Sequence, residues 1–138
     1  MKIIDINNGN FHLSTNEIIT SKDSYSKVLT FEFVDHTENM GNSYEWIYFR
    51  NIHIDNFYFF VAVSFYKKKI KSVNFSFTLK PQEKDWDNWN EKEELQLKKM
   101  FDLWLDNNIG EKTNFNWGKI NSYYDKREQT SGIRIEYN

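Results

Sequence analysis

A period of two in the bulky apolar residues in the middle of the chain constrains its fold more than any other feature. The residues that share one face of this pattern are Phe57, Phe59, Val61, Val63, Phe65, Val73, Phe75, Phe77 and Leu79. Successive side chains of an extended strand point to opposite faces, so a period of two indicates β-strands. Residues 44–54, 57–66 and 70–79 therefore predict a three-stranded antiparallel meander. Its turns fall at Asp55-Asn56 and at residues 67–69.

Two further pairs of segments predict hairpins at the ends of the chain. Residues 3–6 and 11–13 flank Asn8-Gly9, a dipeptide that tolerates the positive φ angles of a two-residue turn. Near the other end, residues 118–124 are followed by the alternating residues 133–137. We expect an N-terminal hairpin and a C-terminal hairpin.

Residues 28–43 divide into a predicted strand and a predicted loop. In residues 28–34, Leu29, Phe31 and Phe33 alternate with polar residues, which is typical of a half-buried strand. Residues 35–43 are rich in Asn, Gly and charged residues, which predicts a loop.

The periodicity becomes helical after Pro81. The apolar residues that fall on one helical stripe are Leu97, Met100, Phe101, Trp104 and Leu105. Asn90 and Glu93 resemble a capping box, and Gly110 is a suitable stop, so we expect one main helix over residues 90–108. Together these segments predict an α+β fold in which a mostly antiparallel sheet carries that helix. At 138 residues, we expect a single domain over residues 1–138.

Charge and cysteine content exclude several classes of function. The chain has no cysteine, which excludes disulfides and thiolate-bound metals. Its net charge is −2, which argues against nucleic acid as a partner because such surfaces need excess Lys and Arg. The apolar run 57–66 is too short to cross a bilayer, and Asp5 interrupts any signal-peptide core. We expect a cytoplasmic protein with no membrane partner.

No catalytic motif stands out in the sequence. There is no nucleophile elbow, phosphate-binding loop or dinucleotide fingerprint. His12, His36 and His53 lack the spacing of metal ligands. We therefore expect no enzyme, cofactor or metal site, although an acid–base role for His36 or His53 stays open as an alternative.

Acidic residues and tryptophans gather around the start of the predicted helix. The candidate partner-binding residues are Asp85, Trp86, Asp87, Trp89, Glu91 and Glu94. Carboxylates also stabilise the positive end of a helix dipole, and tryptophans also fill cores, so structural roles are the alternative interpretation. The lysines at 67–69 and 71 are open to a similar choice, between phosphate binding and protection of a sheet edge.

The second half of the chain resembles small uncharacterised bacterial proteins, some of which are described as immunity proteins of polymorphic or contact-dependent toxin systems. The segments that carry this resemblance are Trp86-Asp87-Asn88-Trp89, Glu93-Glu94, Trp104-Leu105, Phe115-Asn116-Trp117-Gly118-Lys119-Ile120, Tyr124-Asp125 and Ile133-Arg134-Ile135-Glu136-Tyr137. The chain departs from the pattern at Lys126, where many of those proteins have proline. The resemblance implies a fold and no catalytic residue.

Three functional hypotheses follow. The first is a non-enzymatic binding protein of the immunity type, which neutralises a basic toxin domain by surface association. The second is a module for a small ligand or carbohydrate that uses sheet aromatics such as Trp46, Tyr48 and Tyr58. The third is an enzyme that uses one of the histidines.

Overall fold

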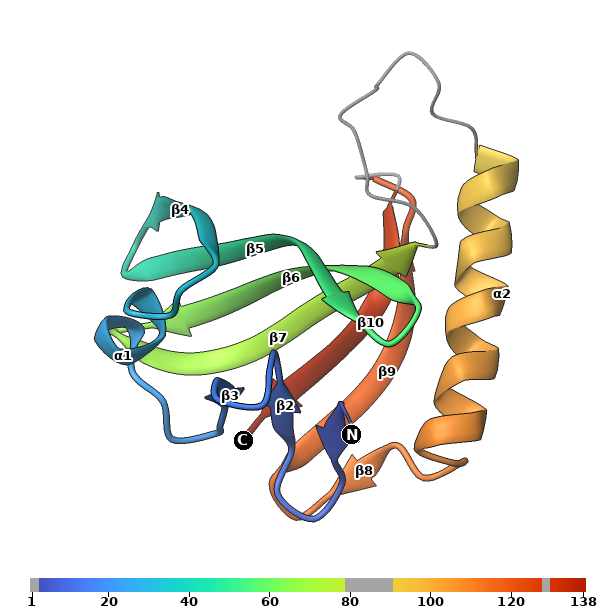
Figure 1. Cartoon of the computed structure of the whole chain (residues 1–138), viewed down its shortest axis with the longest axis horizontal. Coiled ribbons are helices and arrows are strands. Elements are labelled where there is room, and N and C mark those ends of the chain that lie inside the picture. Colours follow the sequence, from blue (N-terminus) through green and yellow to red (C-terminus); the bar gives the residue numbers. More distant parts are fainter. Residues whose placement is uncertain (1–2, 79–90, 128–129) are drawn as a thin grey trace.

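The computed structural model describes residues 3–78, 91–127 and 130–138, which form two antiparallel sheets and two helices (Figure 1). The large sheet has seven strands in the order β4-β5-β6-β7-β10-β9-β8. These strands are β4 (Val34–Gly41), β5 (Tyr44–Ile54), β6 (Phe57–Tyr66), β7 (Lys69–Thr78), β8 (Asn114–Phe115), β9 (Gly118–Asp125) and β10 (Thr130–Tyr137). The remaining elements are β1 (Ile4–Asp5), β2 (Asn10–His12) and β3 (Ile18–Ile19), which form the small sheet, and the helices α1 (Tyr25–Leu29) and α2 (Glu91–Asn108).

The predicted meander is confirmed as β5, β6 and β7, but it does not stand apart from the C-terminal hairpin. β10 pairs with β7 as well as with β9, so Ile133 lies opposite Phe75 and the hairpin extends the meander into one sheet. The sequence predicted a three-stranded meander plus hairpins, whereas the structure has one sheet of seven strands that includes both the meander and the C-terminal hairpin. Pairing between β7 and β10 joins segments about 60 residues apart, and no local pattern reports such a long-range choice.

The prediction of a strand over residues 28–34 was wrong. Residues 25–29 form α1, and the two apolar side chains Leu29 and Phe33 are 44% and 56% exposed. Ser24 caps this helix, because its hydroxyl accepts a hydrogen bond from the Lys27 amide. Val28 is fully buried and the Tyr25 ring packs edge-on against Phe65, so docking on the sheet outweighs the alternating pattern.

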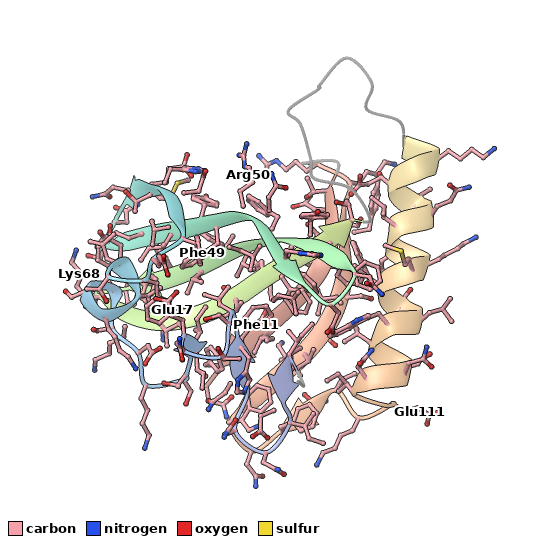
Figure 2. The ribbon with its side chains drawn as sticks, in the orientation of Figure 1. Phe11, Glu17, Phe49, Arg50, Lys68 and Glu111 are labelled. Atoms are coloured by element: carbon pink, nitrogen blue, oxygen red, sulfur yellow. The ribbon has the colours of Figure 1, made fainter. Side chains whose placement is uncertain are left out.

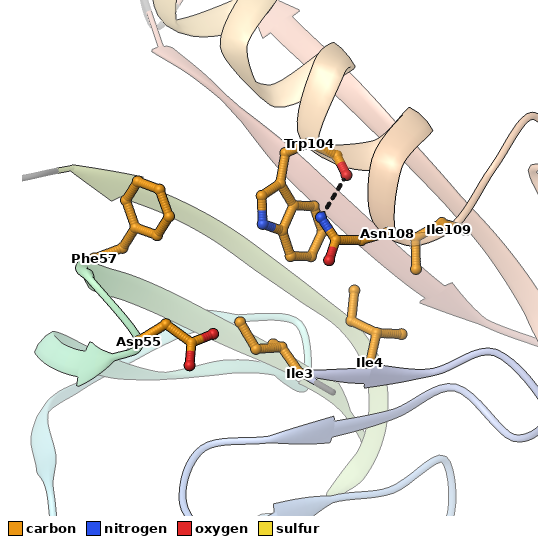
Figure 3. Close-up of a pocket in the computed structure, with 7 residues that line it drawn as sticks. All are labelled: Ile3, Ile4, Asp55, Phe57, Trp104, Asn108 and Ile109. Carbon is orange, nitrogen blue, oxygen red and sulfur yellow. Dashed lines mark hydrogen bonds between the residues drawn. The ribbon is translucent and has the colours of Figure 1, made fainter. Parts of the chain in front are cut away.

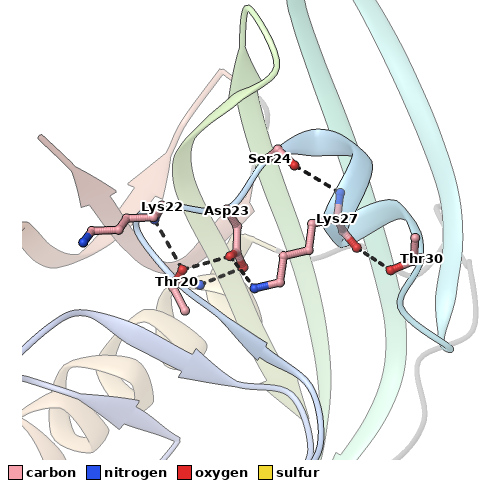
Figure 4. A network of polar contacts seen from close by, with 6 residues as sticks. All are labelled: Thr20, Lys22, Asp23, Ser24, Lys27 and Thr30. Carbon is pink, nitrogen blue, oxygen red and sulfur yellow. Dashed lines mark hydrogen bonds and ion pairs between the residues drawn. The ribbon is translucent and has the colours of Figure 1, made fainter.

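A buried carboxylate holds α1 to the rest of the fold (Figure 4). Asp23 accepts hydrogen bonds from the Thr20 amide at 3.0 Å and the Thr20 hydroxyl at 2.9 Å. Its other contact is an ion pair with Lys27 at 2.8 Å. The backbone carbonyl of Asp23 also accepts a hydrogen bond from the Ile70 amide, which links the residues before α1 to β7. These contacts satisfy a carboxylate whose burial would otherwise be costly.

The prediction of a loop over residues 35–43 was also wrong, because residues 34–41 form the edge strand β4. β4 pairs with β5 and its side chains are exposed apart from the half-buried Val34. An edge strand needs no apolar face, so its polar composition looks like that of a loop. The turn itself is Asn42-Ser43, with φ angles of 53° and 70°.

The N-terminal hairpin is confirmed, and it belongs to the small sheet. The Gly9 amide donates to the Asp5 carbonyl at 2.7 Å, closing the turn between β1 and β2. Trp117 donates its indole N–H to the Ile6 carbonyl, and Tyr137 donates its hydroxyl to the Gly9 carbonyl. A Cβ at Gly9 would lie 2.5 Å from the Trp117 ring, so this turn requires glycine.

The core lies on one face of the large sheet, which we call the inner face. Phe11 of β2 packs on Phe75, and Phe101 and Trp104 of α2 pack on Phe77. Phe49 points into this interior, whereas Arg50 points away from it (Figure 2). The small sheet, α1 and α2 all contact the inner face, with α2 running along β9 and β10 (Figure 1).

The main helix agrees with its prediction. Its apolar stripe packs against the core, and Phe101 is fully buried. It ends where the Gly110 amide, at a φ of 90°, donates to the Leu105 carbonyl. The capping residue expected at Asn90 lies outside the described residues.

Candidate binding surfaces

The opposite face of the large sheet, which we call the outer face, is formed by the residues that alternate with the core positions. It includes His36, Glu38, Trp46, Tyr48, Phe60, Ala62, Ser64, Ser72, Asn74, Ser76, Tyr123 and Arg134. Residues 57–66, which form β6, are apolar on nearly both faces, a pattern that predicts a strand covered on both sides. Among the described residues, however, the elements outside the sheet contact the inner face, and Phe60 is only half-buried.

Two nearly parallel aromatic rings of β5 lie on the outer face. Tyr48 stacks on its cross-strand neighbour His36, with ring centroids 4.4 Å apart and an interplanar angle of 11°. The Trp46 ring is 6.1 Å from Tyr48 and 15° from parallel. Trp46 and Tyr48 are two residues apart on β5, so both side chains lie on this face. We call these two rings the aromatic plate.

Glu38 holds the plate in position. The Tyr48 hydroxyl donates to Glu38 Oε2 at 2.7 Å. Burial, and then the hydrogen bond to this carboxylate, raise the pKa of Tyr48 well above its ordinary value. Tyr48 therefore stays neutral and fixed near neutral pH.

Small side chains lie next to the aromatic plate on β6 and β7. Ala62, Ser64 and Ser72 are 6%, 6% and 9% exposed, and the two hydroxyls are 2.5 Å apart. They are buried because larger side chains surround them on the same face. We call these residues, with Asn74 and Ser76, the polar strip.

An ordered arginine borders the polar strip on its other side. Arg134 lies over the Tyr123 ring, 4.7 Å from its centroid, and donates from Nε to Asn74 Oδ1 at 2.9 Å. Burial raises the pKa of Tyr123, although the charge of Arg134 opposes that rise. The outer face thus presents a polar strip between the aromatic plate and a stacked Arg–Tyr pair.

A pocket of about 110 Å³ lies on another side of the molecule, where α2 ends. It is lined by Ile3, Ile4, Asp55, Phe57, Trp104, Asn108 and Ile109 (Figure 3). These residues come from β1 and the residue before it, from the β5–β6 hairpin and from the C-terminal part of α2. The Asn108 amide nitrogen donates to the Trp104 carbonyl at 2.8 Å, which orients the side chain.

Most of the contact residues predicted from sequence lie outside the described part of the chain. Asp85, Trp86, Asp87 and Trp89 belong to residues 79–90, and the side chain of Glu91 is likewise not described. Glu94 is half-buried, and its carboxylate accepts from the amide and the hydroxyl of Ser131, each at 2.7 Å. Glu94 therefore joins α2 to β10; a role in partner binding stays a prediction.

A second carboxylate on the same side of α2 makes a similar contact. Ser122 of β9 donates to Asp102, which Lys98 also contacts at 2.9 Å. Burial alone would raise the pKa of Asp102, but the hydrogen bonds from Ser122 and Lys98 outweigh it and lower the pKa. Glu94 and Asp102, eight residues apart, join the helix to two neighbouring strands.

The histidines lie in three different places. His36 Nδ1 is 2.5 Å from Asp35 Oδ2, and both side chains are exposed on the edge strand β4. His53 stacks on Tyr58 of the outer face at 4.7 Å, and His12 lies in β2. Within residues 3–78, 91–127 and 130–138, no three His, Asp or Glu residues are grouped as a metal site would require.

Of the lysines predicted as a phosphate site or an edge device, Lys67 and Lys68 form the β6–β7 turn, whereas Lys69 and Lys71 lie in β7, which is not an edge strand of the sheet. Lys67 and Lys68 have φ angles of 50° and 68°, values that fit a two-residue hairpin turn. Lys68 pairs with Glu45 at 2.6 Å and lies 4.4 Å from the Tyr25 ring centroid. It therefore helps to join α1 to the hairpin, and phosphate binding stays a prediction.

Comparisons of the chain with models of known protein families, with curated proteins and with solved structures give no match. In the described part of the chain, neither helix combines the length and the apolar character that a membrane crossing needs.

The sequence indicated only part of the outer face. Trp46, Tyr48 and Tyr58 were proposed as sheet aromatics, and the structure places all three on this face. Arg134 and Tyr123 were missed, because only the pairing of β10 with β7 brings them beside Asn74. The pocket was missed for the same reason, since distant segments build it.

Proposed function

We propose that this chain is a non-enzymatic binding protein of the immunity type, which acts in the cytoplasm by associating with a toxin domain. The observation that supports this proposal is the outer face, where a seven-stranded sheet presents ordered aromatic and arginine side chains. The described helices and the small sheet pack on the opposite face.

The residue types of the outer face favour association with a protein. Tryptophan, tyrosine and arginine are the side chains most enriched among energetic hot spots of interfaces. Here Trp46, Tyr48 and Arg134 are held by ring stacking or hydrogen bonds. Because these side chains are already ordered, binding costs less side-chain entropy.

The proposed partner is a basic toxin domain. The chain has a net charge of −2, and Glu38 brings a carboxylate to the outer face, where Glu136 is paired with Lys119 and Arg134. The acidic residues Asp85 and Asp87 remain candidate contacts on sequence grounds. Opposite charge on two partners speeds their encounter and helps to reject wrong partners.

A pull-down with the product of a neighbouring gene, followed by calorimetry, tests the proposal. Trp46→Ala should weaken the complex by about 2 kcal/mol, or roughly 30-fold, if the outer face is the interface. Phe33→Ala is the matched control, because Phe33 is an exposed aromatic residue before β4 and off the aromatic plate. Equal affinity of the two variants would contradict the proposed interface, and lack of any stable partner would contradict the function.

A carbohydrate-binding module is the second candidate, favoured by the position of the aromatic plate beside the polar strip. Aromatic faces pack on the apolar face of a sugar, while hydroxyl and amide groups bond to its hydroxyls. A panel of oligosaccharides should then raise the melting temperature of the wild type and of Phe33→Ala, but not of Trp46→Ala. An equal rise in all three proteins would place the sugar elsewhere.

A further inference from the structure

The pocket at the end of α2 combines an apolar lining with acceptor oxygens. Ile3, Ile4 and Ile109 supply aliphatic walls, and Phe57 and Trp104 supply aromatic ones. Figure 3 shows the Asp55 carboxylate turned toward Ile3 and the Asn108 amide oxygen turned toward Ile4. Because the Asn108 nitrogen donates to the Trp104 carbonyl, its oxygen is the group left to face the pocket.

This combination of groups favours a ligand with a positive charge on an apolar stem. A carboxylate and an amide oxygen accept hydrogen bonds from an ammonium group. The Trp104 ring adds a surface that attracts cations, and the isoleucines can cover methylene groups. An anionic ligand would meet the charge of Asp55, and the described residues that line the pocket include no Lys, Arg or His.

We infer that this pocket binds an alkylammonium group, with the ammonium at Asp55 and Asn108 and the alkyl stem against the isoleucines. A volume of about 110 Å³ fits a short unbranched chain. The ammonium could come from a free amine or from a lysine side chain of another protein. The lysine source deepens the proposed function, since a basic toxin domain would offer such side chains; the free amine does not depend on it.

The backbone conformation at Asp55 allows a substitution that changes only the charge of this residue. Asp55 follows β5 in the β5–β6 turn with a φ of 54°, in the left-handed region that Asn adopts at least as readily as Asp. Asp55→Asn therefore keeps the turn and the shape of the side chain but removes the charge. Glu32→Gln is the matched control, because it makes the same change in net charge at an exposed residue before β4.

The binding test is a titration of the methyl NMR signals of Ile3, Ile4 and Ile109 with n-butylammonium chloride. We expect saturable shifts in the wild type and in Glu32→Gln, and about tenfold weaker binding in Asp55→Asn. The neutral analogue n-butanol should also bind about tenfold more weakly than the ammonium ion. Equal binding by n-butanol, equal binding by Asp55→Asn, or no saturation would each overturn the inference.

A second titration separates the two sources. It uses lysine whose α-amino and α-carboxyl groups are blocked and whose side-chain ammonium is free. Binding as tight as that of n-butylammonium favours a lysine side chain that enters from a neighbouring protein. Binding of n-butylammonium alone favours a free amine, because the pocket then excludes a stem attached to a backbone. Neither titration requires the toxin domain, so failure of the proposed function would leave the inference intact, and its own failure would leave the outer-face interface intact.

Discussion

The inner and outer faces of the large sheet come from the same strands but differ in what they do. On the inner face Phe59, Phe75 and Phe77 are almost completely buried and contact one another and α2. On the outer face Trp46, Tyr48 and Phe60 are half-buried and contact mainly their neighbours on the same face. Among the described residues, the inner face therefore holds the helices and the small sheet to the large sheet, whereas the outer-face side chains pack mainly on one another.

The largest expected effect separates the two faces by their contribution to stability. Phe77→Ala should lower the free energy of unfolding by about 3–5 kcal/mol, because it leaves a cavity under α2. Phe60→Ala removes the same side chain from the outer face and should cost roughly 1 kcal/mol, since neighbours and water can fill the space. Urea unfolding of both variants measures the difference. Equal losses would mean that the outer face is also part of a closed core.

A serine pair extends the comparison to hydrogen bonds. Ser131→Ala removes the buried hydroxyl that donates to Glu94 and should lower the free energy of unfolding by about 1.5 kcal/mol. Ser76→Ala, on the outer face of β7, should change it by less than about 0.5 kcal/mol. Chemical denaturation resolves these values, and a larger loss in Ser76→Ala would reverse the expected order.

A pH series probes the contact between α2 and β9 on the inner side. The folded pKa of Asp102 is lowered, so its contribution to stability is present above the unfolded value of about 3.9 and is lost as the pH falls through the folded pKa. Asp102→Asn should therefore be less stable than the wild type at pH 7, by up to about 1 kcal/mol, and the gap should close below about pH 4.

The control for this series is Asp106→Asn, a substitution at an exposed residue of the same helix. We expect it to follow the wild type in thermal unfolding from pH 7 down to pH 3. A gap between wild type and Asp102→Asn that does not change with pH would contradict a role for the ionised carboxylate.

The smallest expected effect lies at the β6–β7 turn, which belongs to neither face. Lys67→Asn should raise the free energy of unfolding by about 0.5 kcal/mol, because Asn tolerates the φ of 50° better than Lys. Lys69→Asn, in the adjoining strand, should give no gain, since Asn is disfavoured in strands. Thermal unfolding of the two variants shows whether backbone strain or the lysine charge governs the stability contributed by this turn.

Prediction from sequence worked where the local pattern and the long-range packing agree. The meander was found because Phe59, Val61 and Val63 alternate and their face is indeed buried. The main helix was found because its stripe from Leu97 to Leu105 has the period of the face that packs on the core. Gly9 and Gly110 marked turns that require positive φ, which few other residues adopt.

Prediction failed where local pattern and packing disagree. Leu29, Phe31 and Phe33 alternate like a strand, but Ser24 caps a helix and Val28 docks it on the sheet. β4 looks like a loop because an edge strand buries almost nothing of its own. For the candidate sites, the sequence indicated the aromatics of β5, but it had no means of placing Arg134 or Asp55 beside their partners.

Periodicity and turn residues within short segments were enough to predict the α+β class, the strands β5 to β7, the main helix and the two terminal hairpins. The pairing of β10 with β7, the packing of the described helices on one face of the sheet, and the pocket formed by three distant segments became visible in the folded chain alone. The physical reason is that a local pattern fixes which side chains share a face. Which distant face covers them depends on the packing of the whole chain.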